Sequence, residues 1–265
     1  MNLIKLIFFL VIFINFNIHA ETNRIIIATT TSTYDSGLLK YINTFFEKKN
    51  NIKVHPISVG TGQAIRIASN GDADILLVHH KESEIEFIKN GYGIKRFQLM
   101  YNDFLIVGPK NDKDNCKSIE KKLNYIKNNK LVFISRGDDS GTHKKEKELW
   151  ENNDLNPSNF EFWYIENGQG MGSTLLMTNE KRAYTLTDRA TWITFKKREN
   201  LKIICENQPP LLNQYSIIAV NPKINKNINY EGATKYIRWI LSAEGKNLIN
   251  NYKVKDTQLF FFNYK

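Results

Sequence analysis

The sequence has 265 residues, of which 42% are hydrophobic and 24% are charged. This length allows one large or two modest domains with a full core, and the composition is that of an ordinary globular protein. The net charge of +10 would suit a nucleic-acid partner. The lysines are scattered along the chain rather than gathered in a stripe, so we expect no nucleic-acid binding.

The start of the chain has the pattern of a secretory signal peptide. Lys5 precedes an unbroken apolar run over residues 6–14, and the small residue Ala20 ends the segment. The run is shorter than the roughly 20 residues that a membrane-spanning helix needs, and no cysteine near Ala20 could carry a lipid anchor. We therefore expect cleavage of residues 1–20 and a mature protein free in the periplasm, not embedded in the membrane.

Strands and helices are predicted to alternate along the first part of the chain. An apolar run typical of a buried strand ends in five hydroxyl residues at 29–33, more than the one or two that a helix cap needs. A later strand ends in the glycine- and hydroxyl-bearing turn 60–63, which is weak evidence alone. The expected elements are strands at 24–28, 52–59, 75–78 and 104–109 and helices at 38–46, 64–68 and 82–90.

Histidines and cysteines give no metal-site pattern. The pair His79-His80 follows an expected strand, but a metal site needs a third ligand, and none is found in the sequence. We interpret the pair as the end of a loop and expect no metal ion held by side chains. Cys116 and Cys205 are the only cysteines in the sequence. The periplasm permits a disulfide, and the sequence leaves open whether these two residues pair.

The most informative stretch is the turn at residues 135–143, between an expected strand at 131–134 and a helix that runs to about residue 153. The free N–H groups and the positive dipole end of such a helix form an anion site. Arg136 adds a fixed positive charge. Ser140 and Thr142 add hydroxyls, and Gly141 permits close approach of an anion to the backbone. The alternative is that Ser140 is only a helix cap and Arg136 only a partner for a neighbouring aspartate.

The remaining elements extend the alternation and predict parallel sheets in two α/β lobes. They comprise helices at 117–129, 173–178, 230–241 and 243–249, strands at 163–165, 183–186 and 216–220, and a helix that contains Trp192 and Phe195 after a cap at 187–188. Ligands of such sheets bind beyond the carboxyl ends of the strands. We place lobe I at residues 21–106 plus 222–265 and lobe II at residues 107–221, with the ligand cleft between them.

Several long blocks resemble the TupA family of periplasmic tungstate-binding proteins, in the same order and over essentially the whole mature chain. These blocks are T-T-T-S-T-Y-D-S-G (29–37), V-G-T-G-Q-A (59–64), N-G-D-A-D-I-L-L-V-H (70–79), Y-N-D-F-L-I-V-G-P (101–109), S-R-G-D-D-S-G-T-H-K-K-E (135–146), G-Q-G-M-G (168–172) and Y-T-L-T-D-R (184–189). The resemblance implies a type II periplasmic-binding-protein fold with a two-stranded hinge. It also implies capture of tungstate, with molybdate second, for an ABC permease and its ATPase, by a monomer without a cofactor.

A second resemblance concerns the central turn. Arg136-x-Asp138-x-Ser140-Gly141-Thr142 is similar to the R-x-D-x-S-G-T signature of periplasmic phosphate-binding proteins, in which the acidic residue accepts the proton of phosphate. Tungstate carries no proton at neutral pH. Asp138 is therefore expected to turn away and pair with Arg136 or cap the helix. If Asp138 instead faces the ligand, the alternative is a phosphate-binding or other small-oxyanion-binding protein.

From the turns and the two resemblances we expect donors from both lobes around the ligand. The primary set is Thr30, Thr31, Ser32, Thr61, Arg136, Ser140, Gly141 and Thr142, with Tyr184 and Gly170 as additional lining residues. An enzyme is the competing class, because Ser140, His143 and Asp139 are neighbours. They do not form the G-x-S-x-G elbow, and residues three apart on one helix need a distant third partner for a triad. We therefore expect a binding protein, not an enzyme.

Overall fold

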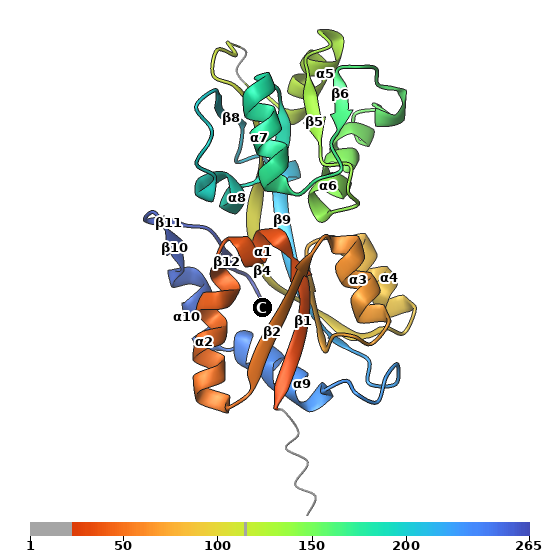
Figure 1. The fold of residues 1–265 in the computed structure, drawn as a ribbon, viewed down its shortest axis with the longest axis vertical. Coiled ribbons are helices and arrows are strands. Elements are labelled where there is room, and N and C mark those ends of the chain that lie inside the picture. The colour runs from red at the N-terminus through yellow and green to blue at the C-terminus, as the bar shows by residue number, and fades with distance from the viewer. Residues whose placement is uncertain (1–22, 114–115) are drawn as a thin grey trace, which may run out of the picture.

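The computed structural model describes residues 23–113 and 116–265, so the predicted signal peptide lies outside the described residues. Figure 1 shows two bodies along the long axis of the molecule, joined by the strands β4 (Gly93–Pro109) and β9 (Leu212–Val220). These two strands pair antiparallel. They form the two-stranded connection expected of a type II periplasmic-binding-protein fold. We call the lower body lobe I and the upper body lobe II.

Lobe I is built on a sheet whose order is β12-β4-β9-β3-β1-β2. The strands β1 (Arg24–Thr30), β2 (Lys53–Val59) and β3 (Ile75–Val78) are parallel. β1 and β3 are almost wholly buried, which explains their continuous apolar sequences. The helices of this lobe are α1 (Thr31–Asp35), α2 (Leu38–Asn50), α3 (Thr61–Ser69), α4 (Lys81–Lys89), α9 (Tyr230–Ile240) and α10 (Ala243–Asn251).

In lobe II, β4 continues and pairs antiparallel with β7 (Thr185–Asp188) and β8 (Leu201–Cys205). Beside them, β5 (Phe133–Ser135) and β6 (Tyr164–Glu166) form a short parallel pair. The sheets are therefore mixed, and the prediction of parallel sheets was wrong in this respect, because β4 and β9 pass antiparallel between the lobes. The helices are α5 (Ile119–Asn128), α6 (Gly141–Glu151), α7 (Met171–Lys181), α8 (Arg189–Thr194) and the 3₁₀ turns η1 (Pro157–Asn159) and η2 (Pro209–Leu211).

Each lobe has its own core. Ile27, Leu77 and Ile217 belong to a large buried cluster in lobe I, and Phe104 and Trp150 to another in lobe II. The residue boundaries that we assigned to the lobes stay predictions. Within the described ranges, every helix is too short or too polar to cross a membrane.

A disulfide joins Cys116 to Cys205, which answers the question that the sequence left open. The two cysteines are 89 positions apart and connect the start of lobe II to β8. In the chain-entropy model a crosslink of this span stabilises the folded state by about 4–5 kcal/mol. The crosslink lies within lobe II, so it does not tie the two lobes together.

Candidate oxyanion site

A small pocket lies where the strand ends of the two lobes meet. Its lining residues are Thr30, Thr31, Ser32, Val59, Gly60, Thr61, His79, Arg136, Ser140, Gly141 and Thr142. All residues of the predicted primary set are among them, while their role in binding stays a prediction. The cavity volume is about 10 Å³, close to the minimum for one water molecule. The pocket as it stands has no room for an organic metabolite, and a tetrahedral anion of four oxygens needs its walls to move apart.

Arg136 brings a positive charge into this pocket. It follows β5 directly and is only 5% exposed. Its Nη2 forms an ion pair with Asp138, whose Oδ1 also accepts the N–H of Ser140 at 3.3 Å. Asp138 is thus held by the arginine and the turn, and it does not line the pocket. This geometry agrees with the interpretation in which Asp138 turns away from the ligand.

The amino end of α6 points its free backbone groups at the pocket. Ser140 is the N-cap of this helix, and its Oγ accepts the N–H of His143 at 3.2 Å. The capping interpretation of Ser140 is therefore correct, and it is compatible with an anion site. A hydroxyl that accepts one hydrogen bond keeps its own hydrogen to donate. Gly141 and Thr142, in the first turn, add N–H groups without a helical partner.

Three polar atoms of the pocket residues are buried without a hydrogen-bond partner among the residues that the structure describes. They are Thr61 Oγ1, His79 Nδ1 and Arg136 Nε. Each unpaired buried polar group costs on the order of 1–3 kcal/mol. The three atoms come from three separate segments and from both lobes. The residues that bear these atoms line one small pocket, and unsatisfied polar groups are what a site for a hydrogen-bonded ion requires.

His79 is a pocket residue that the sequence analysis missed. It lies directly after β3, and its ring packs against that of Tyr215 with centroids 4.7 Å apart and planes tilted by 42°. Burial and, after it, the charge of Arg136 lower the pKa of His79 to about 3. The ring is therefore neutral at physiological pH and adds no charge. Its neighbour His80 is the N-cap of α4, and the Nδ1 of His80 accepts the N–H of Ser83 at 3.3 Å. His80 therefore lies where the loop after β3 ends.

The five consecutive hydroxyl residues divide into two groups. Thr30, Thr31 and Ser32 line the pocket. Thr29 instead donates its hydroxyl to the carbonyl of Leu77 at 2.9 Å, and Thr33 bonds the hydroxyl of Thr30 at 2.9 Å. Thr29 and Thr30 point to opposite faces because they are neighbours in β1, whereas Thr31 and Ser32 begin α1 at the pocket.

The lobes approach each other closely beside the pocket. A Cβ on Gly141 would lie 2.5 Å from Cε1 of His79 and 2.8 Å from Oγ1 of Thr61. Lys144 of α6 also donates to the hydroxyl of Ser83 in α4 at 3.3 Å. Only glycine fits between the lobes at position 141, which explains this residue in the turn.

Comparison with known proteins decides the family. A model described as the PBP superfamily domain matches residues 17–244. The tungstate-binding protein TupA of Peptoclostridium acidaminophilum is 47% identical, over 86% of this chain and 81% of the relative. The chain belongs to the TupA family. Among solved structures, TupA from Desulfovibrio alaskensis G20 has a TM-score of 0.80 and 39% identity, covering 91% of this chain and 99% of that one.

A second solved structure agrees with this assignment. It is described as the tungstate ABC transporter from Geobacter sulfurreducens. Its TM-score is 0.79 and its identity 45%, over 86% of this chain and 98% of that one. These comparisons confirm the resemblance inferred from the sequence blocks and the type II periplasmic-binding-protein fold.

The two additional lining residues predicted from the sequence lie elsewhere in this TupA-family chain. The hydroxyl of Tyr184 bonds Asp112 at 2.8 Å, within the core of lobe II. We expected the strand at 183–186, but β7 begins at Thr185, so its carboxyl end is Asp188 and Tyr184 precedes its amino end. Gly170 is exposed at the start of α7, and a Cβ there would meet no atom within 4 Å.

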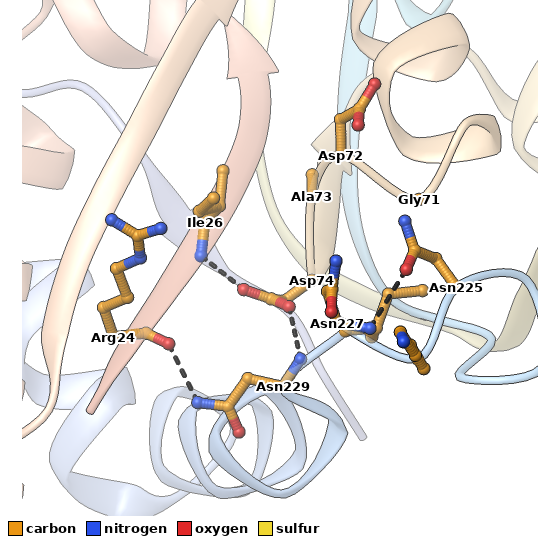
Figure 2. Close-up of a pocket in the computed structure, with 11 residues that line it drawn as sticks. Arg24, Ile26, Gly71, Asp72, Ala73, Asp74, Asn225, Asn227 and Asn229 are labelled. Carbon is orange, nitrogen blue, oxygen red and sulfur yellow. Dashed lines mark hydrogen bonds between the residues drawn. The ribbon is translucent and has the colours of Figure 1, made fainter. Parts of the chain in front are cut away.

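Figure 2 shows a wider cavity, of about 520 Å³, at the other end of β1. Its central carboxylate, Asp74, accepts the N–H of Ile26 at 2.7 Å and the N–H of Asn229 at 2.6 Å. The amide of Asn229 donates to the carbonyl of Arg24 at 2.8 Å. These polar groups already satisfy one another, and the cavity lies at the amino ends of β1 and β3, so we assign it a structural role.

Proposed function

We propose that this chain is the solute-binding component of an ABC importer that captures tungstate in the periplasm and delivers it to a membrane permease. The observation that carries the proposal is a set of three buried polar atoms, Thr61 Oγ1, His79 Nδ1 and Arg136 Nε, on residues that line one small pocket between the lobes. None of the three has a hydrogen-bond partner among the described residues. The relatives named tungstate-binding protein TupA support the same ligand.

The energetics favour a site of many donors. A buried dianion is costly to desolvate unless each oxygen receives hydrogen bonds. Charge-assisted hydrogen bonds contribute about 1.5–3 kcal/mol each. About seven of them would offset the desolvation and leave nanomolar affinity, which corresponds to about −12 kcal/mol. The hydroxyls of lobe I and the Arg136 turn of lobe II offer this number.

The proposal includes the route of the ligand. The pattern of residues 1–20 supports export, and we propose that the mature chain acts as a periplasmic monomer. Closure of the two lobes about β4 and β9 hides the anion from water, and the permease then recognises the closed form. Molybdate is proposed as the second ligand, because it shares the charge and the tetrahedral shape of tungstate.

Binding rather than catalysis is proposed because Ser140 and His143 are not arranged as a nucleophile and its base. Ser140 Oγ accepts the backbone N–H of His143, and the Nδ1 of His143 accepts the N–H of Asp139 at 3.2 Å. A hydrolytic serine needs an imidazole nitrogen to take its proton. The hydroxyl here is a helix cap.

Phosphate is the second candidate, because the turn carries the aspartate of the phosphate-binding signature. In that function the carboxylate must accept a proton from the ligand. Asp138 pairs with Arg136 and does not line the pocket, and its place outside the lining argues against an acceptor role in this chain.

Calorimetric titration of the mature protein, residues 21–265, tests the proposal. The protein is first unfolded and refolded to remove any bound ligand, and it is then titrated with tungstate, molybdate, sulfate and phosphate. We expect one-to-one binding of tungstate, weaker binding of molybdate and no heat with phosphate. Phosphate binding without tungstate binding would make Asp138 an acceptor and overturn the proposal.

A further inference from the structure

A chain of buried hydrogen bonds links the hinge strand β9 to the pocket. Asn213 and Tyr215, on β9, are 1% and 0% exposed. The amide nitrogen of Asn213 lies 3.2 Å from the hydroxyl of Tyr215, and this hydroxyl lies 3.1 Å from Oγ of Ser32. Ser32 lines the pocket, whereas Asn213 and Tyr215 do not. Hydrogen bonds through Tyr215 and Ser32 therefore connect β9 to the candidate ligand site.

This series of hydrogen bonds runs in one direction, from Asn213 through Tyr215 to Ser32. The amide nitrogen of Asn213 can only donate, and it donates to the Tyr215 oxygen and to Asn102 Oδ1 at 2.7 Å. The Tyr215 oxygen thus accepts from Asn213. Ser32 Oγ, at 3.1 Å, is within reach to accept the hydrogen of Tyr215, and we orient this bond from Tyr215 to Ser32. Ser32 accepts this hydrogen and keeps its own to donate. Oγ of Thr30 also lies 3.2 Å from Ser32, but an anion is a stronger acceptor than a hydroxyl and takes the hydrogen when bound.

We propose that Tyr215 is a positioning residue that favours the donor role of Ser32 and thereby adds to the selection of fully deprotonated tetrahedral dianions. This inference rests on the proposed oxyanion-binding function and refines its ligand class. Tungstate offers four oxygens without protons, so every group that faces it must donate. Phosphate at neutral pH carries at least one O–H, and this group needs an acceptor.

The other acceptors near the pocket do not supply this discrimination. Asp138 is paired with Arg136 and lies outside the lining. The neutral ring of His79 can donate or accept through Nδ1, depending on its tautomer, so it suits either kind of anion. The hydroxyl of Ser32 would be equally adaptable without Tyr215. The hydroxyl of Thr61, which has no partner among the described residues, can also donate or accept. The contribution of Tyr215 is therefore to favour the donor role of Ser32, and it adds to the selection rather than making it alone.

The test compares Tyr215→Phe with wild-type protein in titrations with tungstate and with phosphate. The variant keeps the ring that packs against His79 and loses the hydroxyl. We expect the ratio of tungstate affinity to phosphate affinity to fall by about tenfold or more, because Ser32 can then turn and accept the O–H of phosphate. Tyr236→Phe is the matched control. Its hydroxyl is equally buried and bonds Asn43 at 2.6 Å, away from the pocket, so the ratio should stay within about twofold.

Ser32→Ala is a second variant for the same titrations, and its result does not depend on whether Tyr215→Phe is stable. It should weaken tungstate binding about tenfold without any gain for phosphate, and Tyr215→Phe should change nothing further in its presence. An unchanged ratio in Tyr215→Phe, or equal weakening of both anions, would leave Tyr215 a merely structural group and overturn the inference alone. Wild-type protein that binds neither anion would instead contradict the proposed function.

Discussion

The two ends of β1 present opposite kinds of cavity. At its carboxyl end, the residues of the small pocket include three buried polar atoms without a partner in the part of the chain that the structure describes: Thr61 Oγ1, His79 Nδ1 and Arg136 Nε. At its amino end, the cavity of about 520 Å³ in Figure 2 surrounds Asp74, whose two oxygens each accept a backbone N–H. The central carboxylate of the larger cavity therefore has its hydrogen bonds, whereas polar atoms of the smaller pocket have no partner among the described residues.

Under the proposed function, this contrast means that unsatisfied hydrogen-bonding groups, rather than volume, distinguish the binding site. An unpaired buried donor lowers the stability of the empty protein, and a ligand that accepts from it recovers that free energy. A satisfied carboxylate such as Asp74 offers a ligand nothing and stabilises the fold instead. Variants at the two ends of β1 should therefore affect different properties: affinity at one end and the free energy of unfolding at the other.

Arg136→Ala should have the largest effect. Removal of a buried, hydrogen-bonded charge costs about 4 kcal/mol of binding free energy, so tungstate affinity should fall about a thousandfold. The fold should be retained, as measured by circular dichroism and thermal unfolding. Arg24→Ala, in the wide cavity, is the control and should change the affinity by less than about twofold. Unchanged affinity in Arg136→Ala would remove this residue from the site.

Asp74→Ala should act on stability alone. Asp74 is 6% exposed, and its loss leaves two buried N–H groups unpaired. The free energy of unfolding should fall by about 3 kcal/mol in urea titrations, while the tungstate affinity of the folded protein stays within about twofold. The exposed neighbour Asp72 is the control, and its alanine variant should unfold like the wild type. If the Asp74→Ala protein folded but did not bind tungstate, the assignment of a purely structural role to the wide cavity would be contradicted.

The sequence predicted the pocket better than the sheets around it. Strand-to-helix turns rich in glycine and hydroxyls are local patterns, and the carboxyl ends of strands meet by topology, so the primary residues could be found. His79 also follows the carboxyl end of a strand, β3, but it was interpreted as a loop end because no third metal ligand was found. Its contact with Tyr215, far away in sequence, is visible only in the structure. Tyr184 was misplaced by a shift of two residues in the start of β7, since strand ends have weak local signals.

The missing strands have a similar explanation. We predicted β4 only from residue 104, but it begins at Gly93. Its first part carries Lys95, Arg96 and Gln98, which hide the apolar alternation of a strand that passes along the surface of lobe I. β8 and the short strands β10 (Lys253–Val254), β11 (Thr257–Gln258) and β12 (Phe261–Phe262) were also missed. Runs this short depend on their partners rather than on propensity.

Thr61→Val should change affinity and stability in opposite directions. The hydroxyl of Thr61 is buried without a partner among the described residues, so its removal should leave the ligand-free protein as stable or up to about 1 kcal/mol more stable. Loss of one donor to the anion should weaken tungstate binding about tenfold. Calorimetry and urea unfolding of the same preparation measure both.

Thr29→Val is the matched control for this variant. Thr29 is equally buried, but its hydroxyl donates to Leu77 and does not line the pocket. It should lose about 1 kcal/mol of stability without a change in affinity. If the two substitutions changed affinity and stability equally, the lack of a hydrogen-bond partner would not distinguish ligand-binding hydroxyls from structural ones.

The smallest expected effect is that of pH on tungstate affinity. Burial and the charge of Arg136 hold the pKa of His79 at about 3, so the ring is neutral throughout the range from pH 6.5 to 8.5. A bound dianion raises this pKa, and linkage then makes binding tighter as the pH falls. The increase must exceed three units, or about 4 kcal/mol, before it is seen near pH 6.5. We therefore expect the affinity to vary less than about threefold across this range. A tenfold tightening toward pH 6.5 that disappears in His79→Asn would instead show that His79 binds the anion as a cation, and the pocket would then carry two positive charges rather than one.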